Sequence, residues 1–148
     1  MPIHQTLQQK RAEAAFNCAK KASQDLSKDK FKEYVNLVKK LPAMIHTNGL
    51  GQALAFLAAK AGTKEGHVDR GTPHGLLYTQ LEKWLTTIPE PGERFRAPYT
   101  APVRDESNQP TRLIYRIACG DSATYRRATA ETLAFLNWLK SLADALQD

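Results

Sequence analysis

The spacing of the histidines and cysteines is the most direct sequence test for metal binding and nucleophilic catalysis. The chain has four histidines and two cysteines, which are His4, His46, His67, His74, Cys18 and Cys119. No histidine lies at zinc-site spacing from another histidine or a cysteine, and neither cysteine has a recognisable activating context. No serine occupies a nucleophile elbow. We therefore predict no metal site and no catalytic residue, so the chain is not expected to be an enzyme.

Two further patterns bear on cofactor binding and acid–base catalysis. Gly49 and Gly51 are separated by one residue, as in some nucleotide-binding loops, but a third glycine, a preceding strand and a phosphate-binding lysine are all missing. The acidic residues Glu82, Glu131 and Asp144 form no pair that is close in sequence. We interpret the glycines as a turn that allows close packing, and we predict no cofactor.

The basic residues are the most informative group, because their charge is unevenly distributed. The 148 residues carry 21 Lys and Arg against 15 Asp and Glu, a formal net charge of +6. Residues 1–41 hold nine basic and four acidic side chains, which places +5 of this charge in the first quarter of the chain. Such asymmetry favours an anionic partner, most often RNA or DNA. A solvated surface that aids solubility is the alternative.

The elements that position these residues are predicted to be helices. Apolar residues recur at helical spacing wherever they are periodic, which predicts an all-α, single-domain, orthogonal-type bundle of five to six helices over residues 1–148. We expect helices over about 5–26, 28–45, 50–60, 73–88, 113–119 and 123–146. The segment 50–60 is apolar on nearly every side, and we expect it to be a central helix that the others surround.

Proline and glycine predict the interruptions. Pro42 should break or kink the second helix. Irregular loops are expected near 61–72, which is rich in glycine, and near 89–111, which holds five of the eight prolines. The second loop carries Arg94, Arg96 and Arg104, and it is either a contact surface or a flexible connection. Residues 113–119 alternate as a strand would, but they have no sheet partner, so we expect a short helix.

The cellular setting is predicted from what the sequence lacks. No stretch reaches the roughly 20 apolar residues of a membrane span, and no charged start with an apolar run marks a secretory signal. Cys18 and Cys119 are far apart and make a poor disulfide framework. We expect a cytoplasmic protein without membrane contact, with both thiols as small apolar core groups.

Three stretches carry a resemblance to a known family. The first joins Arg11-Ala12 to residues 37–42, Ile45, residues 48–52 and residues 54–56. The second consists of Tyr78, Leu81, Trp84 and Leu85. The third comprises Tyr125-Arg126, Ala128-Thr129, Glu131, Leu133, Phe135-Leu136 and Trp138-Leu139-Lys140. Together they resemble the small helical subunit, the fifth protein, of the type III-B CRISPR effector, the Cmr complex. The two irregular loops lie outside the resemblance.

The resemblance implies a role in antiviral RNA targeting. In that family, a few copies of the small subunit stack as a minor filament beside the backbone subunits that hold the guide RNA. Target cleavage belongs to the backbone subunits and cyclic-nucleotide signalling to the large subunit. The expected partners are therefore guide RNA and target RNA, the backbone and large subunits, and further copies of the chain itself.

Charge and resemblance together point to binding of the RNA backbone without sequence preference. Eight basic residues on predicted helices are the candidates, namely Arg11, Lys20, Lys21, Lys39, Lys40, Arg126, Arg127 and Lys140. The alternative for each is a solvated or salt-bridged surface charge. For the whole chain, the alternatives are a protein scaffold whose basic face meets acidic neighbours, and a ribonuclease.

Overall fold

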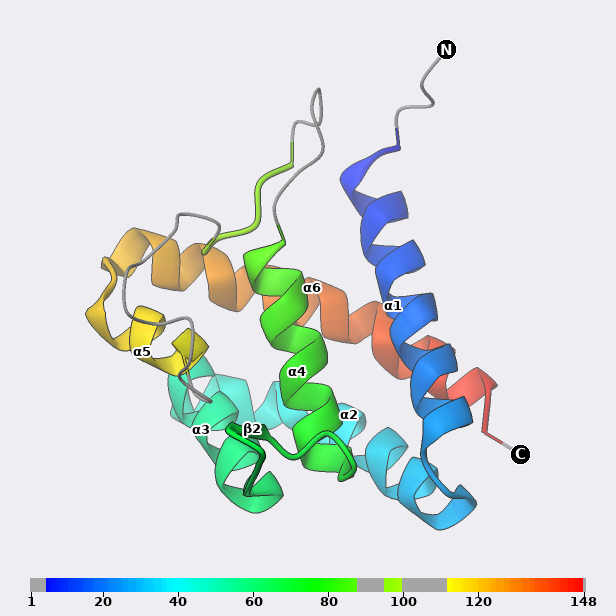
Figure 1. Cartoon of the computed structure of the whole chain (residues 1–148). Coiled ribbons are helices and arrows are strands. Elements are labelled where there is room, and N and C mark those ends of the chain that lie inside the picture. Colours follow the sequence, from blue (N-terminus) through cyan, green and yellow to red (C-terminus); the bar gives the residue numbers. More distant parts are fainter. Residues whose placement is uncertain (1–4, 88–94, 100–111, 148) are drawn as a thin grey trace.

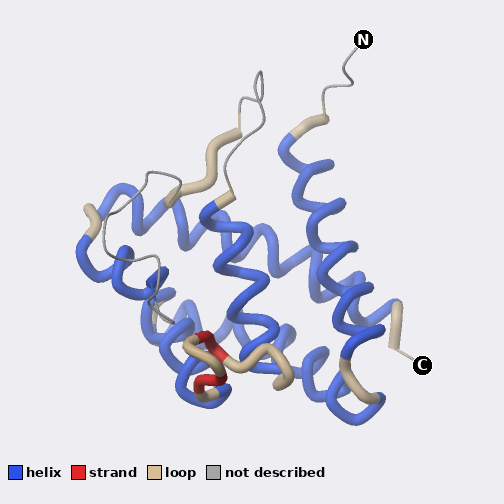
Figure 2. The backbone as a smooth tube through the Cα atoms, viewed as in Figure 1, coloured by secondary structure: helices blue, strands red, loops and turns tan. Residues whose placement is uncertain are grey.

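The computed structural model describes residues 5–87, 95–99 and 112–147 of the chain (Figures 1 and 2). Within these residues it has six helices and one two-stranded hairpin. They are α1 (Leu7–Asp25), α2 (Lys28–Asn48), α3 (Leu50–Ala61), β1 (Thr63–Lys64), β2 (His67–Val68), α4 (Pro73–Thr86), α5 (Arg112–Cys119) and α6 (Ser122–Ala145). The all-α fold is confirmed, and residues 113–119 form a helix as expected.

The first helix packs through small residues. A capping box starts α1, in which the Thr6 side chain accepts from the Gln9 amide and the Gln9 side chain accepts from the Thr6 amide. Ala15, Ala19 and Ala22 are fully buried on one side of the helix. Their short side chains let α1 come close to α6, which is its main packing partner.

Of the break or kink expected at Pro42, the break is wrong, because α2 runs without interruption from Lys28 to Asn48, and the kink stays a prediction. Proline removes only one backbone donor, the one that would bond to the Val38 carbonyl. Leu41 and Ile45 are buried on either side of it, so packing holds both halves of the helix in place. The helix ends at Gly49, whose φ of 90° is a left-handed conformation that favours glycine.

The apolar helix α3 is not enclosed on all sides. It packs against α2, α4 and α5, and it buries Leu50, Ala53, Leu54 and Leu57. Its outer side is rich in alanine, whose small side chain costs little free energy to expose to water and favours helix formation. The more central element is α4, which contacts α1, α2, α3 and α6 (Figure 1).

The loop expected near 61–72 contains the small hairpin. Strands β1 and β2 pair antiparallel, and Glu65 and Gly66 between them both have positive φ, 54° and 80°. This conformation at both turn positions matches the twist of a two-residue hairpin. Thr72 is the N-cap of α4, and its side chain accepts from the Gly75 amide at 3.0 Å.

The N-cap of α6 is Asp121, whose carboxylate accepts from the Thr124 amide at 2.7 Å. The buried face of this helix includes polar residues. Leu146 is 38% exposed, whereas the polar residues Glu131 and Thr132 are buried. Of the proline-rich loop, 89–94 and 100–111 lie outside the described residues, so its interpretation as a contact surface or a flexible connection stays a prediction.

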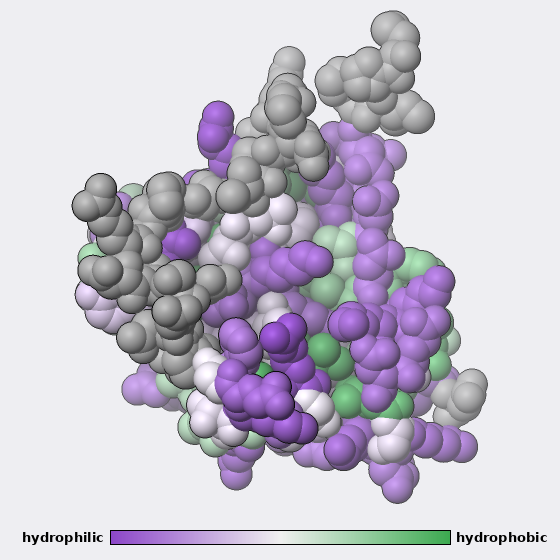
Figure 3. Space-filling model, in the orientation of Figure 1, coloured by the Kyte–Doolittle hydropathy of each residue, from purple (hydrophilic) through white to green (hydrophobic). Residues whose placement is uncertain are grey.

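All six described helices contribute to one connected apolar core. Figure 3 shows hydrophilic residues along the outward side of α1, with apolar residues at the surface between α1 and α4. In the part of the chain that the structure describes, no helix is both long and apolar enough to cross a membrane.

Candidate nucleic-acid interface

The eight candidate residues lie on three helices, α1, α2 and α6, that pack against one another. All of them except Arg11 are exposed. The structure divides them into a lysine group at one end of α6, a pair on α1, an arginine pair at the other end of α6, and Arg11 in the interior.

Lys39 and Lys140 lie where α2 and α6 are joined by an ion pair, and Lys40 follows Lys39 on α2; we call these three residues the α2–α6 lysine group. The ammonium of Lys39 lies 2.9 Å from the Asp144 carboxylate, which joins the exposed faces of the two helices. Lys140 precedes Asp144 by one helical turn, and Lys40 follows Lys39 directly. The Lys40 charge acts on His74 at the start of α4, together with that of Lys60, because consecutive residues of a helix face different sides.

The two lysines of α1 differ in their surroundings. Lys21 is paired with Asp25 on the next turn, at 3.0 Å, and both side chains are more than half exposed. Within the described residues, no carboxylate lies within ion-pair distance of Lys20, Lys40 or Lys140. Among the candidate lysines, these three are the ones without an ion pair in the described residues.

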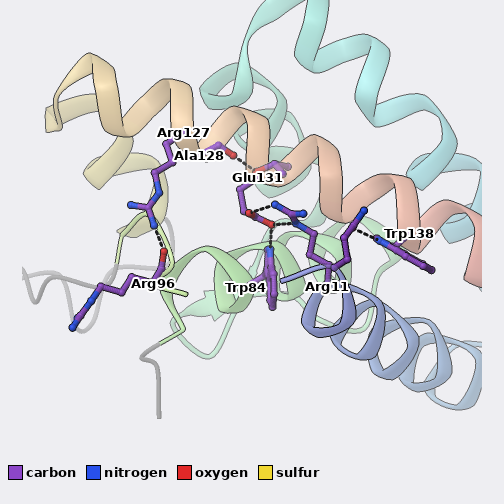
Figure 4. Close-up of polar contacts among 9 residues, drawn as sticks. Arg11, Trp84, Arg96, Arg127, Ala128, Glu131 and Trp138 are labelled. Atoms are coloured by element: carbon purple, nitrogen blue, oxygen red, sulfur yellow. Dashed lines mark hydrogen bonds and ion pairs between the residues drawn. The ribbon is translucent and has the colours of Figure 1, made fainter. Parts of the chain in front are cut away.

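Arg11 is engaged inside the protein (Figure 4). Its Nε and Nη2 donate to the two carboxylate oxygens of Glu131, at 2.7 and 2.8 Å. Trp84 Nε1 donates to the same carboxylate at 3.0 Å. The side chains of Arg11 and Glu131 are only 17% and 7% exposed, and the bond to Glu131 is the main cause that raises the pKa of Arg11. We therefore leave Arg11 out of the proposed RNA surface.

This network connects the three stretches of the sequence resemblance, because each contributes one of its members. Arg11 comes from α1, Trp84 from α4 and Glu131 from α6. The Trp84 ring also stacks on Phe135, with ring centroids 5.1 Å apart. Sequence reasoning missed this cluster because its members are up to 120 residues apart and no local spacing connects them.

The arginine pair lies at the N-terminal end of α6. Arg127 donates from Nη2 to the backbone carbonyl of Arg96, which the sequence had placed in the proline-rich loop (Figure 4). Arg126 is its exposed neighbour. Thirteen residues of helix separate Arg127 from Lys140, roughly 20 Å, so the structure does not bring the arginine pair and the lysine group together.

Two further reactive side chains among the described residues are Cys18 and His74. Burial raises the pKa of the Cys18 thiol to about 11, which keeps it protonated and weakly nucleophilic at neutral pH. Burial lowers the pKa of His74, which packs edge-on against Phe56. Among the described residues, no group of three or more His, Cys, Asp or Glu is placed to hold a metal ion.

Two expectations about single residues are settled by the contacts. Cys119 is exposed at the end of α5, so the prediction that both thiols are core groups is wrong for this one. Gly51 lies against the Tyr125 ring and donates its amide to the Tyr125 hydroxyl at 3.2 Å. The glycines around residue 50 therefore let α3 begin against α6, as the packing interpretation predicts.

Comparison with known proteins agrees with this helical bundle. The family model described as CRISPR-associated protein (Cas_Cmr5) matches residues 7–146. The chain belongs to the Cmr5 family. Its fold is similar to the crystal structure of a CRISPR-associated Cmr5 family protein from Thermus thermophilus, with a TM-score of 0.65 and 26% sequence identity, over 98% of this chain and 100% of that chain.

The Cmr5 match confirms the resemblance found in the sequence and extends it. It covers both irregular loops, which the three stretches did not include. Membership makes the chain a subunit of the type III-B CRISPR effector and implies association with other Cmr subunits.

Proposed function

We propose that this Cmr5 family chain is a non-catalytic subunit that binds the RNA backbone and stacks with further copies of itself along guide and target RNA. The observation that carries the proposal is that three candidate lysines on the packed helices α1, α2 and α6 are exposed and have no carboxylate partner in the described residues, namely Lys20, Lys40 and Lys140. Unpaired ammonium groups on outward helix faces are suited to phosphates.

The arrangement fits recognition of backbone and shape. Pairing between guide and target supplies sequence specificity in such an effector, so its proteins need to contact only phosphates, sugars and the duplex geometry. Lysine suits this task because its flexible stem can follow a phosphate whose position varies. We place the chain in the cytoplasm with guide RNA, target RNA, and the backbone and large Cmr subunits as its partners.

The proposal predicts binding that depends steeply on salt. The double variant Lys39→Gln/Lys40→Gln should weaken binding to single-stranded RNAs of different sequence by similar factors, measured by fluorescence anisotropy at several salt concentrations. The slope of log K against log salt should become shallower by about 0.7 for each phosphate that the variant no longer neutralises.

A matched control separates this site from net charge. Lys60→Gln/Lys64→Gln removes the same charge from exposed positions at the end of α3 and on β1. It should keep most of the wild-type slope. Equal effects of the two double variants, a strong sequence preference, or a flat salt response would contradict the proposal.

A protein scaffold is the second candidate function. Phe16 and Tyr115 are 46% and 55% exposed, and large exposed apolar side chains are typical of protein interfaces. Charge-reversal variants at Lys39 and Lys40 distinguish the two functions. If they abolish assembly with other Cmr subunits when RNA is absent, the basic surface serves protein contacts.

Ribonuclease activity is the third possibility, and labelled RNA tests it directly. The highly purified chain should leave the RNA intact, with or without divalent metal. Cleavage that persists through purification and is lost on a single substitution would contradict a non-catalytic role.

A further inference from the structure

Residues 95–99, which we call the anchored segment, are fixed to the helices at several points. The Phe95 ring stacks on Trp84 with centroids 5.3 Å apart, and the Tyr99 amide donates to the Leu85 carbonyl at 3.0 Å. Ala97 and Tyr99 are 2% and 5% exposed. The segment is therefore part of the packed structure.

Three arginines from separate parts of the chain meet at this segment. Arg96 belongs to the segment and is exposed. Arg127 of α6 donates to the Arg96 backbone carbonyl, and the Arg116 guanidinium of α5 lies over the Tyr99 ring, 5.9 Å from its centroid. Figure 4 shows the Arg96 side chain extending away from the Arg11–Glu131 pair.

The charged side chains that the described residues show in contact with the segment are those of Arg116 and Arg127. Among the described residues, neither Arg96 nor Arg127 forms an ion pair with a carboxylate. The acidic group that acts on Tyr99 is Asp121, whose oxygens already accept from the Thr124 amide and hydroxyl as the cap of α6. This carboxylate is thus engaged in capping, and it forms no ion pair with Arg96 or Arg127 in the part of the chain that the structure describes.

We propose that the anchored segment, with Arg96 and Arg127, forms a second site for RNA phosphates, separate from the α2–α6 lysine group. The proposal rests on the RNA-binding function given above and adds a location to it. Guanidinium groups bind phosphate oxygens through paired donors, so fixed arginines recognise a backbone more rigidly than lysines do. Phe95 is a positioning residue, because its ring on Trp84 fixes the backbone that carries Arg96.

Arg96→Gln tests the site, and Arg70→Gln is the matched control. Arg70 is also exposed, but it lies in the turn before α4. In anisotropy titrations with single-stranded RNA, Arg96→Gln should flatten the log K against log salt slope by about 0.7, whereas Arg70→Gln should leave it unchanged. Arg96→Lys should restore most of the slope, because it keeps the positive charge.

Phe95→Ala tests the positioning role through its rescue. It should weaken binding in the same direction as Arg96→Gln, and Phe95→Tyr should restore binding because its ring can still stack on Trp84. If the wild-type chain binds RNA with a salt-dependent affinity but Arg96→Gln behaves like Arg70→Gln, the second site is wrong. If the wild-type chain shows no salt-dependent binding, alone or in the assembled effector, the proposed function itself fails.

Discussion

At the scale of single residues, Glu131 shows why a basic side chain can be misjudged from sequence. Arg11 is in the charged first quarter of the chain, which groups it with the surface lysines. Its guanidinium instead bonds to a carboxylate 120 positions away. The predicted helices give the side of α1 on which Arg11 lies, but they do not give the residue that it meets. The exposure of Lys20 and Lys40 can be predicted from their own helices without knowing a distant partner, and both side chains are exposed as expected.

Glu131→Gln should destabilise the protein strongly. The change removes the negative charge of the carboxylate. It also places an NH2 group, which can only donate, against the donors of Arg11 and Trp84. Losing one partner of a buried ion pair costs about 3 kcal/mol, which urea unfolding would measure.

Asp144→Asn is the control for this prediction, since it makes the same chemical change in the exposed pair with Lys39. Its cost should stay below about 1 kcal/mol, because exposed ion pairs contribute little. Equal costs for the two variants would contradict a structural role for the Arg11–Glu131–Trp84 cluster.

At the scale of the elements, the sequence predicted where the helices lie along the chain, but it predicted only in part what each helix packs against. The apolar periodicity located five of the six described helices, whereas residues 113–119 were expected to be a helix only because they have no sheet partner. The capping side chains of Thr72 and Asp121 each bond to an amide three residues further on, so these two helix starts depend on local sequence. The break expected at Pro42 is wrong because tertiary packing offsets the loss of one backbone bond. The segment 50–60 was wrongly expected to be surrounded on all sides, because its many alanines can lie either in a core or on a surface.

Two glycines in the first turns of helices should respond oppositely to alanine. A Cβ at Gly75 would lie 1.8 Å from the Asp69 carbonyl oxygen, so the turn before α4 must move. At Gly51 the nearest neighbour is Ile117 Cγ2 at 3.6 Å, an ordinary contact. Gly75→Ala should cost about 3 kcal/mol by overpacking, and Gly51→Ala should stabilise by about 0.5 kcal/mol through helix propensity.

Thermal unfolding of both variants beside the wild-type chain checks this pair. Gly51→Ala also tests the interpretation of the glycine pair as packing, since its amide still donates to Tyr125. A Gly75→Ala protein as stable as the wild type would contradict the prediction, because the turn before α4 would then move at little cost in free energy.

At the scale of the whole molecule, charge asymmetry and family resemblance led to the same function by separate routes. The asymmetry predicted an anionic partner, and the structure distributes the candidate residues over three helices that pack together. The site at the anchored segment was beyond sequence reasoning, because it depends on Phe95 stacking on Trp84 and on a bond from Arg127 to a distant backbone carbonyl. Neither contact follows from local spacing.

The most direct measurement for the central claim is a structure of the Cmr effector assembled with guide and target RNA and containing this subunit. Lys20, Lys40 and Lys140 should lie against phosphates, and neighbouring copies of the chain should stack along the duplex. Outward faces of α1, α2 and α6 that are covered only by acidic protein surfaces, with no RNA contact from any of these lysines, would contradict the account.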